Sequence, residues 1–236
     1  MLMNKKEKSL RSLCVIPARG GSKGIPKKNL TLIKGSSLLS YTIKQAKESG
    51  VFDYIHVSTD CEQIKDDAIK NGANCEFLRP QNFATNKIGT APSIIHSIEE
   101  LNKKNNRFDY VYELQPTYLF RSVDTIKNIH KKLSLKKSIC TVRKVESTAH
   151  PEYICSAFES GKLKLGSKKP DNFARQELSP FFAVIGVVLA SPVSLFKKYN
   201  SFYHENTYSH LIEKKIEFFD INDELDLEIA KNIFEK

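Results

Sequence analysis

The chain has 236 residues, of which 40% are hydrophobic and 27% are charged, and its formal net charge is +10. This composition is typical of a globular domain and excludes an intrinsically disordered chain. No apolar segment approaches the roughly 20 residues that cross a bilayer, so we expect no association with membranes.

Lysine pairs carry much of the positive charge. They recur along the whole chain, from Lys5-Lys6 to Lys214-Lys215, instead of clustering. This scatter argues against a nucleic-acid partner, because nucleic-acid-binding proteins gather their charge on one face. The five cysteines lack metal-binding spacing, so we expect free thiols in a reducing compartment. With no signal peptide recognisable, the protein is expected to be cytoplasmic.

Strand-like and helix-like segments alternate through the first 145 residues. The pattern predicts strands at residues 12–17, 54–59, 75–80, 109–114 and 138–145, and helices at residues 38–50, 60–72, 91–104 and 123–135. Such alternation is typical of βαβ units, whose parallel strands are covered by helices on both faces. We therefore predict a three-layer α/β/α, Rossmann-like fold with a mainly parallel sheet.

The alternation stops at residues 147–180, which are rich in Gly, Pro and Lys and contain only short strand-like pieces. We interpret this segment as an inserted β-rich arm. A buried strand follows at residues 181–191, and the segment at 216–222 precedes a final helix at 224–236. No repeat or linker divides the chain, so a single domain covering residues 1–236 is expected.

The loop "ARGGSKGIPKKN" follows the first predicted strand, where the sheets of α/β proteins bind ligands. It has three glycines, four cationic side chains and no acid, and it matches neither the Walker A nor the G-x-G-x-x-G pattern. Its composition predicts a phosphate-binding loop in which backbone N–H groups and cations hold an anion. The candidate backbone groups are those from Gly20 to Gly24, which include Gly21 and Ser22, and the candidate cations are Arg19, Lys23 and Lys28. A solvated glycine turn is the alternative.

Several motifs along most of the chain resemble one enzyme family. They are "IPARGGSKGIPKKNL" (16–30), "VSTD" (57–60), "FLRPQNFATNKIGTAPSI" (77–94), "LQPTYLFRS" (114–122), "RQELSPFF" (175–182) and "FDINDELDLEIA" (219–230). Together they resemble the cytidylyltransferases that activate sialic acids and related nine-carbon sugars as CMP-sugars. The resemblance implies a nucleotidyltransferase fold, CTP and an acidic nine-carbon sugar as substrates, and a homodimer in which the arm at 147–180 reaches the neighbouring subunit.

The resemblance also assigns residues to the nucleotide. Arg19, Lys23 and Lys28 are expected to hold the triphosphate, with Lys23 as the principal catalytic candidate. Asn29 is expected to contact the nucleotide. Arg79 and Thr90, eleven positions apart, match an arginine and a hydroxyl residue that read cytosine, and a threonine hydroxyl can replace that of a serine.

A magnesium ion is also implied by the resemblance, because phosphate groups and hard oxygen ligands suit it. The family's metal carboxylates form an Asp-Ile-Asp motif at the last strand, and here the matching residues are Asp220, Ile221 and Asn222. Asn222 removes one negative charge, so weaker Mg²⁺ binding is expected, and Asp220 is the stronger candidate for a metal and catalytic residue. Asn222 or Asp223 alternatively caps the helix that follows.

The acceptor site departs further from the family pattern. Gln115 resembles a sugar-contacting residue, and Arg175 matches an arginine that reaches the sugar from the partner subunit. Residues that are polar or differently shaped in the family are replaced here by Tyr118, Leu119, Tyr153, Ala183 and Ile185. A site built around particular hydroxyl groups rejects analogues strongly, so we predict a deoxygenated acylamino sugar of the legionaminic or pseudaminic type as acceptor. An eight-carbon keto-deoxy sugar or a CTP-binding pseudoenzyme remains the alternative.

Overall fold

The computed structural model describes residues 10–22, 24–84, 89–151, 155–157, 163–165 and 179–235. Of the predicted site residues, Lys23 and Arg175 lie outside these ranges. No helix within the described ranges is both long and apolar enough to cross a membrane.

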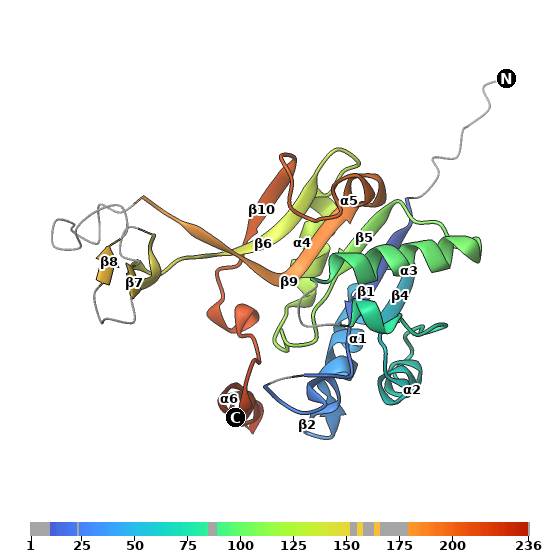
Figure 1. Cartoon of the computed structure of the whole chain (residues 1–236), viewed down its shortest axis with the longest axis horizontal. Helices are drawn as coiled ribbons and strands as arrows, with labels where there is room; N and C mark the ends of the chain where they lie inside the picture. The colour runs from blue at the N-terminus through green and yellow to red at the C-terminus, as the bar shows by residue number, and fades with distance from the viewer. Residues whose placement is uncertain are drawn as a thin grey trace.

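A six-stranded sheet forms the centre of the molecule, in the order β10-β6-β9-β5-β1-β4 (Figure 1). The strands are β1 (Ser12–Pro17), β4 (Tyr54–Ser58), β5 (Tyr110–Glu113), β6 (Ser138–Lys144), β9 (Phe182–Pro192) and β10 (Thr207–Leu211). β1 runs parallel to both β4 and β5, and β10 runs parallel to β6. Only β9 runs against its neighbours β5 and β6. The predicted mainly parallel sheet is therefore confirmed.

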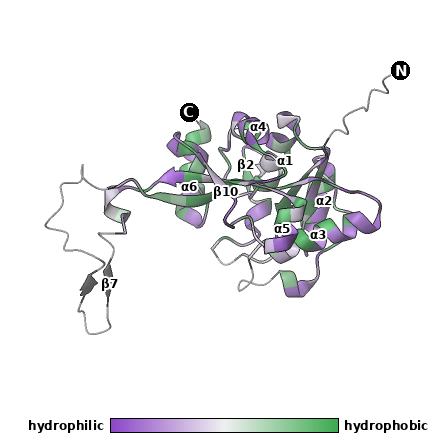
Figure 2. Ribbon diagram, turned by 90° about the horizontal axis from the view of Figure 1, so that it is seen from above, coloured by the Kyte–Doolittle hydropathy of each residue, from purple (hydrophilic) through white to green (hydrophobic). Residues whose placement is uncertain are grey.

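Helices cover the sheet on both faces. They are α1 (Leu38–Ser49), α2 (Glu62–Lys70) and α4 (Val123–Lys132) on one face, and α3 (Ala91–Lys103) and α5 (Val193–Tyr199) on the other. Successive residues of β1 point to opposite faces: Cys14 packs in the first of these layers and Leu13 in the second. In Figure 2, α3 carries both hydrophobic and hydrophilic residues, as a helix with one buried face does. The three-layer α/β/α prediction is confirmed.

A third cluster of buried side chains joins the two ends of the chain. The C-terminal helix α6 (Glu224–Glu235) contributes Leu227 and Ala230, which pack with Ile25 of the glycine-rich loop. The short hairpin of β2 (Leu32–Ile33) and β3 (Ser36–Ser37) adds Ile33. This packing holds the last helix against the first loop.

One predicted strand is wrong. Residues 75–80 form no strand, and only Asn74 makes an isolated bridge, with His56 of β4. The chain then leaves the sheet edge, and the backbone N–H of Arg79 donates to the carbonyl of Thr59 (2.7 Å). Residues 216–222 hold most of a 3-10 helix, Lys215–Phe218, and an irregular segment. The last strand is β10 instead, an edge strand that is mostly exposed and therefore lacks a buried apolar pattern.

Within the predicted arm at 147–180, the described residues include a two-stranded antiparallel hairpin of β7 (Cys155–Ala157) and β8 (Leu163–Leu165). Figure 1 shows this hairpin well away from the six-stranded sheet, beyond the ends of β6 and β9. The arm's boundaries and its contact with a neighbouring subunit stay predictions.

Candidate functional site

A cleft of about 350 Å³ lies at the carboxyl ends of β1 and β5. Its lining brings together ten predicted residues from distant parts of the chain: Arg19, Gly21, Ser22, Lys28, Asn29, Arg79, Thr90, Gln115, Asp220 and Asn222. Of the predicted residues that the structure describes, Gly20 alone does not line this cleft. The cleft therefore gathers the site that the sequence predicts, while the chemical tasks of its residues stay predictions.

The glycine-rich loop is held by internal hydrogen bonds. The Gly20 N–H donates to Asp60 Oδ1 (2.9 Å), so this N–H is engaged within the protein and is not free for a phosphate. A Cβ atom at Gly20 would lie 2.8 Å from the Cβ of Cys61, which is too close for any other residue. The buried Asn29 donates through Nδ2 to the carbonyl of Arg19 (3.0 Å). Asn29 thus fixes the backbone that presents Arg19 to the cleft.

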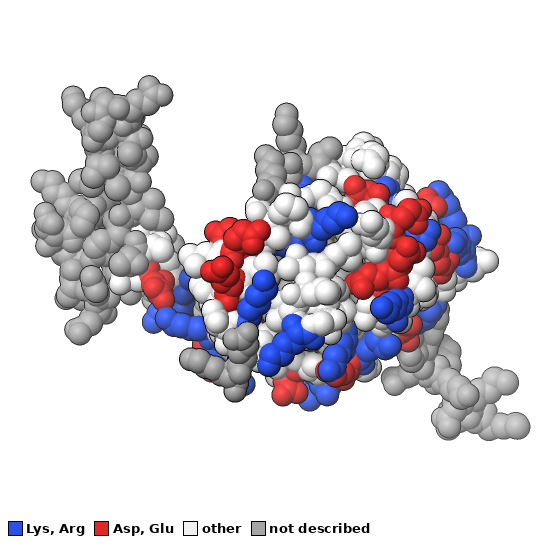
Figure 3. Space-filling model, turned by 90° about the horizontal axis from the view of Figure 1, so that it is seen from below, with Lys and Arg blue, Asp and Glu red and all other residues white. Residues whose placement is uncertain are grey.

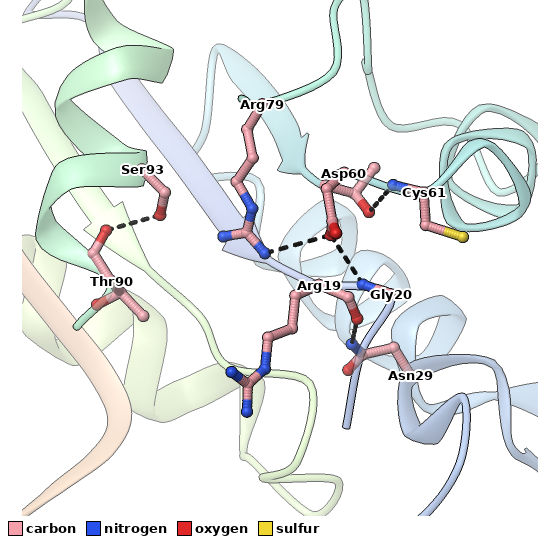
Figure 4. A network of polar contacts seen from close by, with 9 residues as sticks. Arg19, Gly20, Asn29, Asp60, Cys61, Arg79, Thr90 and Ser93 are labelled. Carbon is pink, nitrogen blue, oxygen red and sulfur yellow. Dashed lines mark hydrogen bonds and ion pairs between the residues drawn. The ribbon is translucent and has the colours of Figure 1, made fainter. Parts of the chain in front are cut away.

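Asp60 organises this side of the cleft and was missed as a site residue. Its Oδ1 atom also lies 3.8 Å from the Arg79 guanidinium (Figure 4). Arg79 is buried, which lowers its pKa, and the negative charge of Asp60 acts in the opposite direction. An acid directly after a predicted strand, as in "VSTD", was the signal available in the sequence. The pairing could not be deduced because Arg79 lies 19 positions further on.

A buried carboxyl group connects two predicted contact residues. Glu113 ends β5 and is wholly buried. Its Oε2 accepts from the Thr90 hydroxyl (2.7 Å), and its Oε1 accepts from Gln115 Nε2 (2.8 Å). Burial raises the pKa of Glu113, while these two hydrogen bonds and the charge of Arg121 act in the opposite direction. Sequence reasoning missed Glu113, because a lone acid in "YVYEL" gave no indication that both of its partners line the cleft.

On the other side of the cleft, Lys28 reaches the segment with the predicted metal ligands. Its Nζ donates to the carbonyl of Ile221 (2.9 Å). Partial burial lowers the pKa of Lys28, and the nearby Asp220 carboxylate offsets part of this effect. A Cβ atom on Gly24 would overlap the carbonyl oxygen of Asn222. The loop and the 220–222 segment therefore need glycine at position 24 to approach each other.

Asn222 does not cap the last helix. Asp223 does so: its Oδ1 accepts from the N–H of Asp226 (3.0 Å), and Asp226 Oδ2 accepts in return from the N–H of Asp223 (3.3 Å). This reciprocal pair is a capping box. The Asn222 side chain instead donates to the carbonyl of Asp220 (3.2 Å). Asn222 also lines the cleft.

The residues around Asp220 fit a magnesium ion. Asp220 Oδ1 is buried and has no hydrogen-bond partner among the described residues, which is costly unless something else satisfies it. Within the part of the chain that is described, no three His, Cys, Asp or Glu side chains converge on one point. Mg²⁺ bound with phosphates needs only one or two carboxylates because water and phosphate oxygens complete its shell.

Three of the residues that suggested an altered acceptor site lie in the interior. Tyr118, Leu119 and Ile185 are all buried. They pack in the hydrophobic clusters of the core, and the Tyr118 hydroxyl accepts a hydrogen bond from the N–H of Gly186 (3.2 Å). Gly186 itself lies against Gln115, since a Cβ there would come within 2.7 Å of the Gln115 amide. Tyr153 lies outside the described residues.

The fold and the cleft define a class of protein. A parallel sheet covered by helices on both faces, with a cationic loop at the carboxyl end of its first strand, is typical of nucleotide-binding α/β enzymes. The chain superposes with a TM-score of 0.69 and 12% identity on a solved structure of CMP:2-keto-3-deoxy-manno-octonic acid synthetase complexed with CTP, covering 95% of this chain and 98% of that one. At this identity, the superposition establishes the nucleotidyltransferase fold alone.

The family itself follows from sequence comparison. The family model described as Cytidylyltransferase matches residues 13–216, and the chain belongs to this family of nucleotidyltransferases. It is 32% identical over 233 residues to a CMP-N,N'-diacetyllegionaminic acid synthase of Legionella pneumophila, covering 96% of this chain and 97% of that protein. It is 36% identical over 129 residues to a pseudaminic acid cytidylyltransferase of Campylobacter jejuni, covering 55% of this chain and 56% of that protein.

Proposed function

We propose that the protein transfers CMP from CTP to the anomeric hydroxyl of a sialic-acid-like 2-keto-3-deoxy sugar acid and releases pyrophosphate. The observation that carries this proposal is the composition of the cleft at the ends of β1 and β5: Arg79 and Thr90 line it together with Arg19, Lys28 and Asp220. Groups suited to a pyrimidine edge thus share one cavity with groups suited to a triphosphate. Membership of the cytidylyltransferase family supports CTP as the nucleotide.

The triphosphate is proposed to lie along the glycine-rich loop. CTP carries about four negative charges, and phosphoryl transfer depends mainly on positioning and neutralising them. Arg19 and Lys28 supply positive charge from the described part of the loop. Figure 3 shows basic and acidic side chains interspersed on the face it displays, without one large basic stripe. The local cluster of cations in the cleft therefore suits a small polyanion.

Magnesium is proposed as the cofactor, held by Asp220 and the amide oxygen of Asn222 together with phosphate oxygens. When bound, the ion neutralises charge on the triphosphate and assists the departure of pyrophosphate. Lys28 lies next to this segment through its hydrogen bond to Ile221. Its amine group therefore lies beside the proposed metal ligands.

The proposed acceptor is a deoxygenated acylamino sugar acid of the legionaminic or pseudaminic type. Support comes from two relatives, the CMP-N,N'-diacetyllegionaminic acid synthase of Legionella pneumophila and the pseudaminic acid cytidylyltransferase of Campylobacter jejuni. Tyr118, Leu119 and Ile185 are buried, so their identities do not support the choice of acceptor. Gln115 lines the cleft and is the described residue proposed to contact the sugar.

Pyrophosphate release tests the proposal. Purified protein would be incubated with CTP, Mg²⁺ and each member of a panel of legionaminic, pseudaminic, N-acetylneuraminic and eight-carbon keto-deoxy acids. We expect release with a legionaminic- or pseudaminic-type acid. A strong preference for N-acetylneuraminate or an eight-carbon acid would overturn the acceptor. Tight CTP binding without turnover of any acid would support a pseudoenzyme, the alternative that Asn222 motivates.

We also propose that the protein is a cytoplasmic homodimer. Apolar side chains are exposed near the base of the arm: Phe181, Phe182 and Val184 on β9 and its approach, and Leu211 on β10. Phe181 and Leu211 line a cavity of about 750 Å³ where the ends of β6, β9 and β10 meet. A second copy of the chain would cover this apolar surface.

The described cysteines Cys14, Cys61, Cys75 and Cys140 are free thiols, in keeping with a reducing compartment.

A further inference from the structure

Glu113 is hydrogen-bonded to two residues that line the cleft, Thr90 and Gln115. It lies outside the family motifs found in the sequence. Its side chain is 0% exposed. Each carboxylate oxygen accepts one hydrogen bond from a cleft-lining side chain, Thr90 on one side and Gln115 on the other. Glu113 therefore cannot touch a ligand, but it controls how two groups that can do so present their hydrogens.

The contact with Glu113 decides the polarity of Thr90. A hydroxyl group has one hydrogen to donate and two lone pairs to accept with, and an ionised carboxylate only accepts. Because the Thr90 hydrogen is directed at Glu113 Oε2 over 2.7 Å, only acceptor capacity remains toward the cleft. The hydroxyl would otherwise rotate to suit either kind of partner.

Arg79 provides the opposite polarity in the same cleft. A guanidinium group only donates, and Arg79 is buried with its backbone fixed to Thr59 and its side chain beside Asp60. Its donors match the O2 and N3 acceptors of cytosine. The exocyclic amino group of cytosine is a donor and needs an acceptor, whereas uracil presents a carbonyl oxygen at that position. Figure 4 shows Arg79 and Thr90 on separate elements of the site.

We propose that Glu113 is a positioning residue that gives the enzyme its preference for cytosine over uracil nucleotides, by holding the Thr90 hydroxyl as a hydrogen-bond acceptor. This inference rests on the proposed function, because it requires a pyrimidine triphosphate in the cleft. It adds a buried determinant of base specificity that makes no contact with the nucleotide. The same carboxylate fixes the Gln115 amide with its N–H toward Glu113, which leaves the amide oxygen for the acceptor side.

The test compares CTP with UTP in Glu113→Gln and Thr90→Val variants. Glutamine keeps the size of Glu113 but can donate to Thr90, so the hydroxyl is free to donate toward a uracil carbonyl. We expect the ratio of kcat/KM for CTP to that for UTP to fall about 10- to 100-fold in each variant, as expected for one misplaced buried hydrogen bond. The double variant should fall no further, because Glu113 acts through Thr90.

A matched control is available elsewhere in the chain. Glu217 is also buried and accepts from a threonine hydroxyl, that of Thr125 (2.7 Å), but Thr125, unlike Thr90, does not line the cleft. Glu217→Gln should lower the melting temperature without changing the CTP to UTP ratio. A merely structural task for Glu113 predicts the same behaviour for Glu113→Gln, and an unchanged ratio in that folded variant would overturn the inference.

Nucleotide binding by calorimetry separates this inference from the proposed function. If the wild-type protein binds neither CTP nor UTP, the proposed function and the inference about Glu113 are both wrong. If it prefers CTP and the preference survives in both variants, only the inference fails. Should Glu113→Gln lack a cooperative unfolding transition, Thr90→Val decides alone, because retained CTP preference in that variant contradicts any control exerted through Thr90.

Discussion

Single residues in the cleft show why the loop has its composition. Gly24 is required because the loop touches the carbonyl of Asn222, and Asn29 is required because it holds the Arg19 carbonyl. Both contacts involve the backbone, and both shape the loop whose cations Arg19 and Lys28 line the cleft. The charge pattern that predicts phosphate binding thus depends on uncharged residues for its geometry.

Lys23 lies outside the described residues and remains the principal predicted catalytic cation. Lys23→Ala should leave the melting temperature unchanged and lower kcat/KM by about 100-fold or more, the usual cost of removing one group that stabilises the transition state. Lys27→Ala is the matched control, because Lys27 is in the same loop but bonds to Gln63 and does not line the cleft. Equal kinetics for the two variants would remove Lys23 from the mechanism.

Asn222 allows the proposed metal site to be tested by gain of charge. Asn222→Asp restores a second carboxylate next to Asp220, and Lys28 lies close enough to offset the added charge. We expect the Mg²⁺ concentration that gives half-maximal activity to fall several-fold, since more negative ligands bind the ion more tightly.

Titration of activity against Mg²⁺ measures this change, and Asn206→Asp, an exposed substitution before β10, serves as control. An unchanged or increased Mg²⁺ requirement in the Asn222→Asp enzyme would contradict the assignment of this position to the metal.

His56 predicts how stability depends on pH. It is fully buried against Phe77, neither ring nitrogen has a partner among the described residues, and burial lowers its pKa from 6.5 to about 4. Below pH 6.5, His56 binds a proton in the unfolded chain but stays neutral in the folded protein until the pH approaches 4. His56 therefore costs no stability above that pH and up to about 3 kcal/mol as the pH falls to 4. In urea titrations, His56→Phe should flatten this acid slope, and parallel curves would refute the prediction.

At the scale of elements, one buried guanidinium connects three segments. Arg121 donates to the Val187 carbonyl of β9 (2.5 Å), to Gln45 Oε1 of α1 (3.0 Å) and to the Gln115 carbonyl after β5 (2.6 Å). Burial lowers its pKa to about 10, so it stays charged at neutral pH. Arg121 thus holds the strand end that carries Gln115 rather than contacting a ligand itself.

Arg121→Lys should therefore destabilise the protein strongly. A lysine cannot reproduce the planar fork of donors, so at least one buried carbonyl loses its partner, at a cost of about 3 kcal/mol in the free energy of unfolding. Urea denaturation measures the loss, with the exposed Arg107→Lys as a neutral comparison. Equal midpoints for the two variants would show that the Arg121 hydrogen bonds contribute little.

At the scale of the whole molecule, the apolar surface at the base of the arm predicts association. Phe182 and Val184 are about half exposed and point to the same side of β9. Replacing both with Glu should change the mass in solution from a dimer to the 26.9 kDa of one chain, because charge on an apolar contact opposes its burial. Light scattering measures the mass, and Leu135→Glu, an equally exposed change elsewhere, should leave the dimer intact. A wild-type mass of 26.9 kDa would refute the dimer.

The sequence by itself determined the three-layer fold and the position of the binding site at one edge of the sheet. Alternating apolar segments ending at glycines predict βαβ units, and a cationic loop after the first strand predicts an anion site at that sheet edge, because both signals lie within a few consecutive residues. β10 was not predicted, because an exposed edge strand carries no apolar pattern. Residues 75–80 were wrongly predicted to be a strand, because apolar content alone does not pair a segment with the sheet.

The tertiary structure decided which polar groups meet. Asp60 reaches Gly20 and Arg79, and Glu113 joins Thr90 to Gln115, across separations of up to 40 residues. The tertiary structure also places Tyr118, Leu119 and Ile185 in the core. The resemblance to the family had suggested that they lie near the sugar. A hydrogen bond between distant residues leaves no periodic trace in a chain, so only the folded backbone, which fixes the direction of each side chain, can reveal it.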